Sequence, residues 1–308
     1  MTKLGSSTLD VFPLTLGANP FGWTTDETTS HAVLDAFLEG GGTFVDTADS
    51  YGAGASESIL GSWFAKTGRR EEIVLASKIS RHPDRRGLAP DNVALAVEES
   101  LQRLRSDHLD LLWAHYDDPD TPLEETLGAV DRLVQEGKVR ELGISNYSPD
   151  RIREWLRIAD ENGFHVPVAL QPQYSLLRRH EYEDERQALA LEHNLAVIPY
   201  WGLASGLLTG KYRTAADAKG QARQGLVEGY ASDEAFAVVD VLREVATAHD
   251  AEPATVALAW LSGRPGVVAP IASVSKVAQL PGLLSVPSLA LTDDEADRLT
   301  AASDNVGQ

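Results

Sequence analysis

The chain has 308 residues, of which 43% are hydrophobic, and a formal net charge of −19. A chain this acidic is expected to repel nucleic acid and anionic membranes, and it has no run of about 18 or more apolar residues that would predict a membrane span. The absence of cysteine excludes disulfides, thiolate nucleophiles and cysteine metal ligands, and the lack of a signal-peptide core at the N-terminus predicts a cytoplasmic protein.

Strand-like and helix-like segments alternate along the chain. Turn residues predict a small hairpin at residues 4–11. Apolar runs predict eight strands, at residues 12–17, 43–46, 73–79, 109–115, 139–145, 168–172, 195–200 and 266–271. Helical periodicity predicts helices at residues 30–39, capped by Ser30, and at 56–65, 91–104, 123–135, 149–162 and 184–192. Further helices are expected near residues 233–249 and 253–261, and at 292–302.

This alternation is typical of parallel β/α topology, because a parallel connection needs a crossover helix. The continuously apolar strands indicate that both faces of the sheet are covered. We therefore expect an α/β protein, a single (β/α)8 TIM barrel over residues 1–308 with an N-terminal β-hairpin and extra C-terminal helices. An open doubly wound sheet is the runner-up, although no Gly-x-Gly-x-x-Gly follows the first strand. Residues 213–232 show no clear period, and we expect a partly mobile lid there that covers a cofactor.

Three ionisable residues end three consecutive predicted strands, where barrel active sites form. They are Asp46, Lys78 and His115, and Tyr51 follows in the loop after the second strand. A lysine cation stabilises a phenolate and makes the phenol a better acid, while a carboxylate holds the ammonium in place. A neutral histidine donates a hydrogen bond to a carbonyl oxygen. Such a cluster protonates an oxygen while a hydride attacks its carbon, and since no side chain supplies hydride, a cofactor must.

The chain resembles the aldo-keto reductases over essentially its whole length. The matching motifs are Asp-Thr-Ala-Asp-Ser-Tyr-Gly at 46–52, Lys78, Asp-Leu-x-x-x-His at 110–115, Gly-Ile-Ser-Asn-Tyr at 143–147, Gln171 and Leu-Leu-Thr-Gly-Lys-Tyr at 207–212. The last motif is similar to the branch related to bacterial aldo/keto reductases and potassium-channel β subunits. The resemblance implies metal-free, NAD(P)H-dependent interconversion of carbonyls and alcohols. It also implies Tyr51 as general acid and base, supported by Lys78, Asp46 and His115.

The resemblance further implies how the cofactor is held. Ser145, Asn146 and Gln171 would bind the nicotinamide carboxamide, and Tyr200 would stack on the ring. The other contacts are expected from two loops, Leu203, Ser205, Leu207 and Lys211 in one and Ser273, Ser275, Lys276 and Gln279 in the other. Ala272 and Ser275 stand where many members have a lysine or arginine that grips the 2′-phosphate of NADP. We favour NADPH as the cofactor and keep NADH as the alternative.

An aromatic mouth is expected to select the substrate. Trp23 and Trp201, with Tyr51, His115 and Tyr116, predict a pocket for an aromatic or sugar-like aldehyde or ketone. Two other functions stay open, a cofactor-binding regulatory subunit with vestigial turnover and a metal-dependent hydrolase or isomerase. The intact cluster argues against the first, and the lack of a second strand-end histidine argues against the second. We expect a small-molecule partner and no nucleic acid or membrane; monomer and homo-oligomer are both open.

Overall fold

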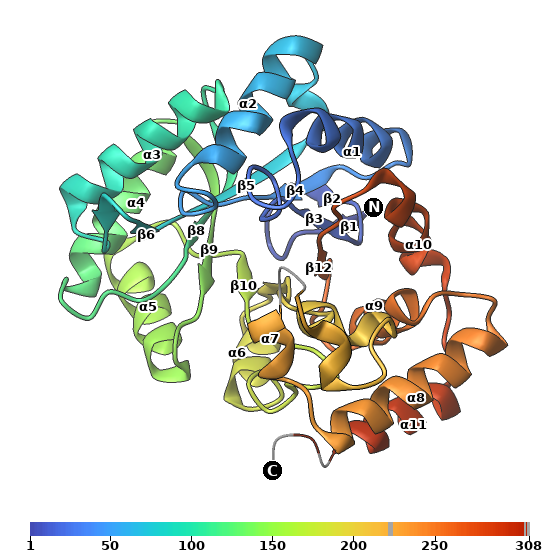
Figure 1. Ribbon diagram of the computed structural model, residues 1–308. Coiled ribbons are helices and arrows are strands. Elements are labelled where there is room, and N and C mark those ends of the chain that lie inside the picture. The colour runs from blue at the N-terminus through green and yellow to red at the C-terminus, as the bar shows by residue number, and fades with distance from the viewer. Residues whose placement is uncertain (221–223, 305, 307–308) are drawn as a thin grey trace.

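Eight parallel strands form the central sheet of the computed structural model, which describes residues 1–220, 224–304 and 306 (Figure 1). Their order is β11-β10-β9-β8-β5-β4-β3-β12. The strands are β3 (Thr15–Gly17), β4 (Phe44–Asp46), β5 (Val74–Ile79), β8 (Leu109–Ala114), β9 (Val139–Ser145), β10 (Ala169–Gln171), β11 (Ala196–Val197) and β12 (Ile271–Ala272). Backbone hydrogen bonds from Val197 to Gly266 and from Ile271 to Pro199 join the two edges. The predicted α/β barrel is confirmed.

Helices surround the strands in Figure 1 and follow the predicted alternation. They are α1 (Glu27–Glu39), α2 (Ala55–Thr67), α3 (Pro90–Leu104), α4 (Leu123–Gln135), α5 (Pro149–Asn162), α6 (Glu185–Glu192), α7 (Gln224–Glu228), α8 (Asp233–Ala248), α9 (Pro253–Ser262), α10 (Leu280–Leu284) and α11 (Asp293–Ser303). Short 3-10 helices occur at Arg70–Glu72, Ala204–Thr209, Ala215–Ala218, Val277–Gln279 and Val286–Ser288. The C-terminal helix α11 packs beside α8 (Figure 1). None of the described helices is long and apolar enough to span a bilayer.

The N-terminal hairpin closes one end of the barrel. Strands β1 (Thr2–Lys3) and β2 (Asp10–Val11) pair antiparallel. Leu4 and Val11 are fully buried and join the cluster of side chains inside the barrel. Gly5 has a φ of +56°, and a Cβ there would lie 2.2 Å from the carbonyl oxygen of Val168. The turn therefore needs glycine both for its conformation and for its close approach to the strand.

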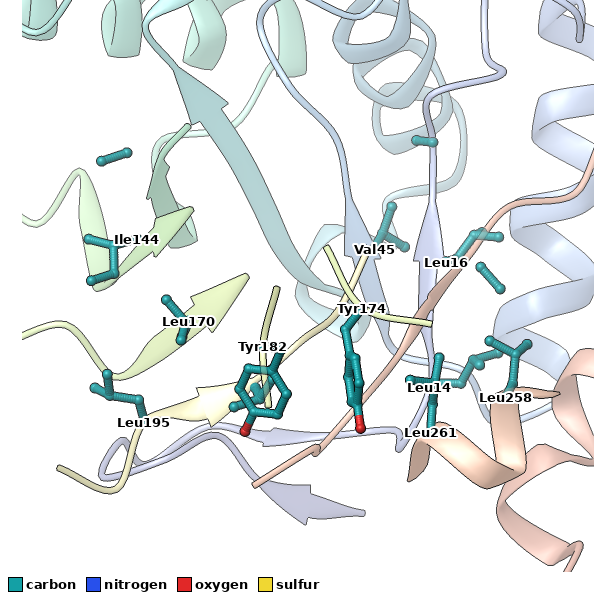
Figure 2. Packing of buried hydrophobic residues seen from close by; sticks show 14 of the residues in the cluster. Leu14, Leu16, Val45, Ile144, Leu170, Tyr174, Tyr182, Leu195, Leu258 and Leu261 are labelled. Carbon is teal, nitrogen blue, oxygen red and sulfur yellow. The ribbon is translucent and has the colours of Figure 1, made fainter. Parts of the chain in front are cut away.

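Successive strand residues face opposite sides of the sheet, as the period of two requires. The outward set packs against helices, and Figure 2 shows Leu16, Val45 and Leu170 in this layer with residues of α9. The inward set fills the barrel with side chains such as Phe44, Leu111 and Trp113 at the hairpin end and in the middle. The same parity places the polar residues at the opposite strand ends, inside the barrel mouth.

Two predicted boundaries, the start of the first helix and the extent of the last strand, are wrong for identifiable physical reasons. Helix α1 begins at Glu27 rather than at Ser30, because the carboxylate of Asp26 accepts the N–H of Thr29 at 2.8 Å and caps the helix earlier. The last strand is Ile271–Ala272 rather than 266–271, because Gly266 and Val268 bond to Val197 before Pro270, which has no N–H, interrupts the ladder.

The segment 213–232 also differs from the prediction of an irregular loop. It contains the 3-10 helix Ala215–Ala218 and helix α7. The expected mobile lid falls partly on residues 221–223, which lie outside the described residues.

Candidate active site

Asp46 and Lys78 meet because neighbouring strands β4 and β5 are slightly offset. Asp46 pairs with Ala76 in the sheet, and Lys78 is the next inward-facing residue along β5. Its ammonium donates to Oδ1 of Asp46, to the carbonyl oxygen of Thr47 at 2.8 Å and to the hydroxyl of Tyr51 at 3.3 Å. Asp46 and Lys78 are both 1% exposed. All three ammonium protons therefore have an acceptor, which offsets the cost of burying the charge.

Tyr51 is held by the turn that leads into α2. Its backbone N–H bonds to Ala48, and its carbonyl accepts the N–H of Ser56. The side chain lies under the cavity mouth, with the ammonium of Lys78 4.9 Å from the ring centroid. The imidazole of His115 stands edge-on to the same ring, with 6.4 Å between the ring centroids. The phenol hydroxyl thus sits between a buried cation and a histidine.

His115 follows β8 directly, and its peptide is fixed by a hydrogen bond from the Asn146 side chain to its carbonyl oxygen at 2.9 Å. Its Nδ1 atom is buried and has no hydrogen-bond partner among the described residues. A buried N–H without an acceptor is costly, so the proton is better placed on Nε2. The imidazole lines the cavity and can donate from that nitrogen.

The charges of the site set its protonation states. Burial lowers the pKa of His115 well below its usual value, and the cations of Lys78 and Arg81 lower it further. Burial raises the pKa of Tyr51, Lys78 opposes this and Asp46 adds to it, so the net pKa lies above the ordinary 10.0. Burial disfavours the ammonium of Lys78, but Asp46 and Tyr51 outweigh it and raise the lysine pKa. The resting site therefore holds a neutral imidazole and a protonated phenol. Lys78 thus offsets only part of the effect of burial, and the pKa of the phenol is not lowered below its ordinary value as the sequence suggested.

Ser145, Asn146, Gln171 and Tyr200 are the residues expected to bind the nicotinamide carboxamide. They form hydrogen bonds with one another and with Asp46. The Gln171 amide donates to Oδ2 of Asp46 at 3.2 Å. The Tyr200 hydroxyl donates to Oδ1 of Asn146 at 2.7 Å, and Ser145 donates to the carbonyl oxygen of Gln171. These five side chains thus form a connected polar floor at the ends of β4, β9, β10 and β11.

A cavity of about 850 Å³ opens above this floor. Fifteen of the predicted site residues line it: Trp23, Asp46, Tyr51, His115, Tyr116, Asn146, Gln171, Tyr200, Trp201, Leu203, Ser205, Lys211, Ser273, Ser275 and Gln279. Among the described residues, Lys78, Ser145, Leu207 and Lys276 are predicted site residues that do not line it. Lys78 and Ser145 are buried and contact the lining residues Asp46 and Asn146. Leu207 is fully buried in the core, and Lys276 is exposed.

The loop after β11 has an unusual backbone where it borders the cavity. Trp201, Ala204 and Ser205 have φ values of +55°, +46° and +57°, a conformation that non-glycine residues seldom adopt. Such strain is concentrated at functional sites. The buried hydroxyl of Ser205 has no partner among the described residues, and the exposed ammonium of Lys211 lies in the same wall. A hydroxyl and a cation there suit the phosphates of a dinucleotide.

The second predicted cofactor loop is closed by its own hydrogen bonds. Oε1 of Gln279 accepts the N–H groups of Ser275 and Lys276 at 2.9 and 3.1 Å. The Ser273 hydroxyl donates to Oδ1 of Asn19 at 2.6 Å, which ties this loop to the one after β3. Lys276 is the cation within this turn, and its side chain is exposed.

Sequence reasoning missed Asn19 and Arg81, which also line the cavity. Arg81 lies in a small hairpin, β6 (Arg81–His82) with β7 (Arg85–Arg86), that was not predicted. The one feature of the sequence that could have indicated Arg81 as a cavity residue is its position three residues after Lys78. No group of three or more His, Cys, Asp or Glu residues able to hold a metal ion occurs in the described part of the chain.

Comparison with known proteins gives a consistent picture. The sequence profile of the aldo/keto reductase family matches residues 13–304. The chain is 35% identical to the uncharacterized oxidoreductase YrpG of Bacillus subtilis, over 94% of this chain and 91% of the relative. It is 30% identical to the aldo-keto reductase yakc [NADP(+)] of Schizosaccharomyces pombe, over 98% and 91%. It is 31% identical to a probable voltage-gated potassium channel subunit beta of Arabidopsis thaliana, over 90% and 88%.

Proposed function

This chain belongs to the aldo/keto reductase family, and on that premise we propose that it reduces an aldehyde or ketone to the alcohol with a nicotinamide dinucleotide. Tyr51 is the proton donor in this proposal. The observation that carries it is the single ammonium of Lys78, which contacts both the buried carboxylate of Asp46 and the Tyr51 hydroxyl. That contact places a positive charge beside the oxygen that must lose a proton.

The geometry supports a simple division of roles. His115 donates from Nε2 to the substrate carbonyl oxygen and holds it beside Tyr51. A reduced nicotinamide held by Gln171, Asn146 and Tyr200 would supply the hydride. Tyr51 gives its proton to the same oxygen, which completes the alcohol, and Lys78 stabilises the phenolate until it is reprotonated. The raised pKa of Tyr51 keeps the phenol protonated before the reaction.

The cavity walls support a dinucleotide as the cofactor. Gln171, Asn146 and Tyr200 lie next to the catalytic cluster, where a nicotinamide amide would find donors and acceptors. Ser205 and Lys211 lie on the wall that would meet the phosphates. We favour NADPH over NADH because Lys276 and Lys211 supply positive charge near the expected phosphates, and one relative is named an NADP(+) enzyme.

The substrate proposed is an aromatic or sugar-like carbonyl compound. Trp23 and Trp201 are 54% and 42% exposed at the mouth, and Tyr116 is 36% exposed beside them. Exposed aromatic side chains around a cavity supply flat apolar contacts to rings. A cytoplasmic location accords with this metabolic role and stays part of the proposal.

Replacing Tyr51 by phenylalanine tests the mechanism. Turnover of a panel of aldehydes with NADPH should fall by at least about 100-fold, the usual contribution of a general acid. Fluorescence titration with NADPH should give a Kd within about twofold of wild type, because the hydroxyl is not needed for cofactor binding. Tyr147→Phe is the control, since it removes a buried tyrosine hydroxyl that is outside the described cavity lining and, unlike that of Tyr51, has no partner among the described residues. Full activity in Tyr51→Phe would refute the assignment.

The same measurements address a second candidate, a cofactor-binding regulatory subunit with little turnover. The similarity to a protein named as a potassium channel β subunit favours it. Tight binding of NADPH without turnover of any aldehyde in the wild-type protein would support this candidate against the reductase. Titration with NADH in parallel tests the cofactor preference, and tighter binding of NADH would overturn it.

A further inference from the structure

Arg81 is a cation on the wall of the cavity that the proposed mechanism leaves unused. Its guanidinium carbon lies 4.4 Å from the ring centroid of Tyr116, so that the guanidinium covers the aromatic ring. The Tyr116 ring in turn contacts the imidazole of His115, with 5.1 Å between the centroids. All three side chains line the cavity. Arg81 is therefore two ring contacts from the catalytic histidine.

The backbone that presents Arg81 is strained and tied down. Ser80, between the end of β5 and Arg81, has a φ of +102°, which is rare for a residue with a side chain. Its hydroxyl accepts the N–H of Tyr116 at 3.2 Å, and its carbonyl accepts the N–H of Gly87. The chain thus reverses sharply after the catalytic strand and is held there by the adjacent loop. Strain of this kind persists where a side chain must be aimed.

The charge of Arg81 is not neutralised within the described part of the chain. No described carboxylate forms an ion pair with its guanidinium, which instead stacks on the Tyr116 ring. Among the described residues that line the cavity, Asp46 is the one carboxylate, and it is already paired with Lys78. The positive potential reaches the reaction centre, because Arg81 contributes to the lowered pKa of His115. An uncompensated cation in the cavity contrasts with the net charge of −19 of the whole chain.

We propose that Arg81 recognises an anionic group on the carbonyl substrate, a carboxylate or a phosphate, so that oxo acids or phosphorylated aldehydes are preferred. This inference rests on the proposed reductase function. The planar guanidinium offers parallel N–H donors to two oxygens of either anion, and stacking on Tyr116 fixes the plane of that fork. Lys211, the other unpaired cation of the lining in the described residues, lies on the wall assigned to the cofactor phosphates. Arg81 is left for the substrate.

The test compares aldehydes that differ only in the anion. Succinic semialdehyde is paired with butanal, and glyceraldehyde 3-phosphate with glyceraldehyde, under saturating cofactor. Wild-type kcat/KM should be about 10- to 100-fold higher for the charged member of one pair than for its neutral partner. A preference within the first pair identifies a carboxylate as the recognised anion, and a preference within the second identifies a phosphate. Arg81→Gln should abolish that preference mainly through KM, while leaving the neutral aldehydes within about threefold.

The control is Arg86→Gln. Arg86 pairs with Arg81 across the β6–β7 hairpin and does not line the cavity in the described structure, so the variant removes the same charge from the same hairpin. It should keep the preference. An Arg81→Gln variant that reduces charged and neutral aldehydes in the wild-type ratio overturns the inference and leaves the reductase function intact.

If turnover is absent, a binding measurement tests anion recognition by Arg81 separately from the proposed reductase function. Calorimetric titration of the NADP⁺-loaded protein with 4-hydroxybutyrate and with 1-butanol needs no reaction. Tighter binding of the hydroxy acid that is lost in Arg81→Gln would support anion recognition even if the reductase proposal fails. Equal binding by wild type and Arg81→Gln would overturn anion recognition for carboxylates, and the same titration with glycerol 3-phosphate and glycerol decides the phosphate arm.

Discussion

The side-chain amide of Gln171 donates a hydrogen bond of 3.2 Å to Oδ2 of Asp46, from β10 across the barrel to β4. The other oxygen of the same carboxylate accepts from Lys78. One buried carboxylate therefore connects the residue expected to hold the nicotinamide amide with the residue that supports the proton donor. In the proposed mechanism, cofactor binding and proton donation therefore share this carboxylate.

Replacing Gln171 by methionine should weaken both the fold and the site. Methionine fills a similar volume but leaves Oδ2 of Asp46 without its donor, which should lower the free energy of unfolding by about 1–3 kcal/mol. NADPH binding should weaken as well. Urea unfolding and fluorescence titration measure the two effects, with Gln102→Met on the exposed face of α3 as the control. Unchanged stability would mean that the bond contributes nothing net.

Removing the ammonium of Lys78 should be more damaging than removing an exposed one. Lys78→Met leaves the Asp46 carboxylate buried without its cation, and breaking such a pair typically costs about 3–5 kcal/mol. Carbonyl turnover should be lost together with stability. The double variant Lys78→Met/Asp46→Leu should recover part of the stability, because no buried charge remains, but no activity. Lys66→Met, at an exposed position of α2, serves as the control in urea unfolding. A double variant as unstable as the single one would contradict this account.

The barrel and the meeting of Asp46, Lys78 and His115 at its mouth were predictable because both follow from local patterns. Continuous apolar runs identify strands covered on both faces, and the period of two then aligns Lys78 with Ala76 and His115 with Trp113 on the inner side. The ends of parallel strands meet at one mouth, so residues far apart in the chain converge there. No knowledge of the loops is needed for this step.

Other features of the fold and of the site could not be predicted, because no periodic pattern in the sequence encodes them. Asp26 and Ser30 are both good capping residues and lie four positions apart, and α1 is capped by Asp26. Arg81 reaches the cavity only through the strained turn at Ser80, and the Gln171–Asp46 bond joins residues 125 positions apart. Tertiary packing decides the last two, whereas the cap is a local hydrogen bond, and no periodicity in the sequence indicates any of the three.

Asp49 provides a prediction about stability and pH. It is 1% exposed, and neither carboxyl oxygen makes a hydrogen bond of normal geometry to a described residue. Burial and then the nearby Glu57 carboxylate raise its pKa to about 7. The raised pKa means that Asp49 favours the fold when protonated. Its contribution is complete below the unfolded pKa of about 3.9 and is lost as the pH rises to about 7.

Asp49→Asn should therefore stabilise the protein at pH 8 and lower its stability at pH 4. The gain at pH 8 should be about 2 kcal/mol, less than the roughly 4 kcal/mol of the full pKa shift, because the new amide N–H groups would also lack partners; at pH 4 the same unpaired amide should cost about 2 kcal/mol. Urea unfolding at both pH values measures it, with Asp297→Asn on exposed α11 as the control. A loss of stability at pH 8 would show that the ionised carboxylate has a favourable partner.

The pH dependence of reduction should show no titration of His115. Burial, Lys78 and Arg81 hold the pKa of His115 far below 6.5, and the pKa of Tyr51 lies above 10.0. The neutral imidazole and the protonated phenol therefore coexist across the neutral range, so kcat/KM should be flat between about pH 6 and pH 9 and fall only as Tyr51 ionises. An inflection near pH 6.5 that disappears in His115→Gln would contradict this prediction.

The same lowered pKa makes a prediction for unfolding. In the unfolded chain His115 binds a proton below about pH 6.5, whereas the folded protein keeps it neutral, so His115 makes stability fall as the pH drops from about 7 to 5. His115→Gln should reduce this slope in urea unfolding, and His180→Gln, at an exposed position, serves as the control that should not. An unchanged slope in His115→Gln would mean that the imidazole is protonated in the folded protein, and it could not then act as the neutral donor to a substrate carbonyl.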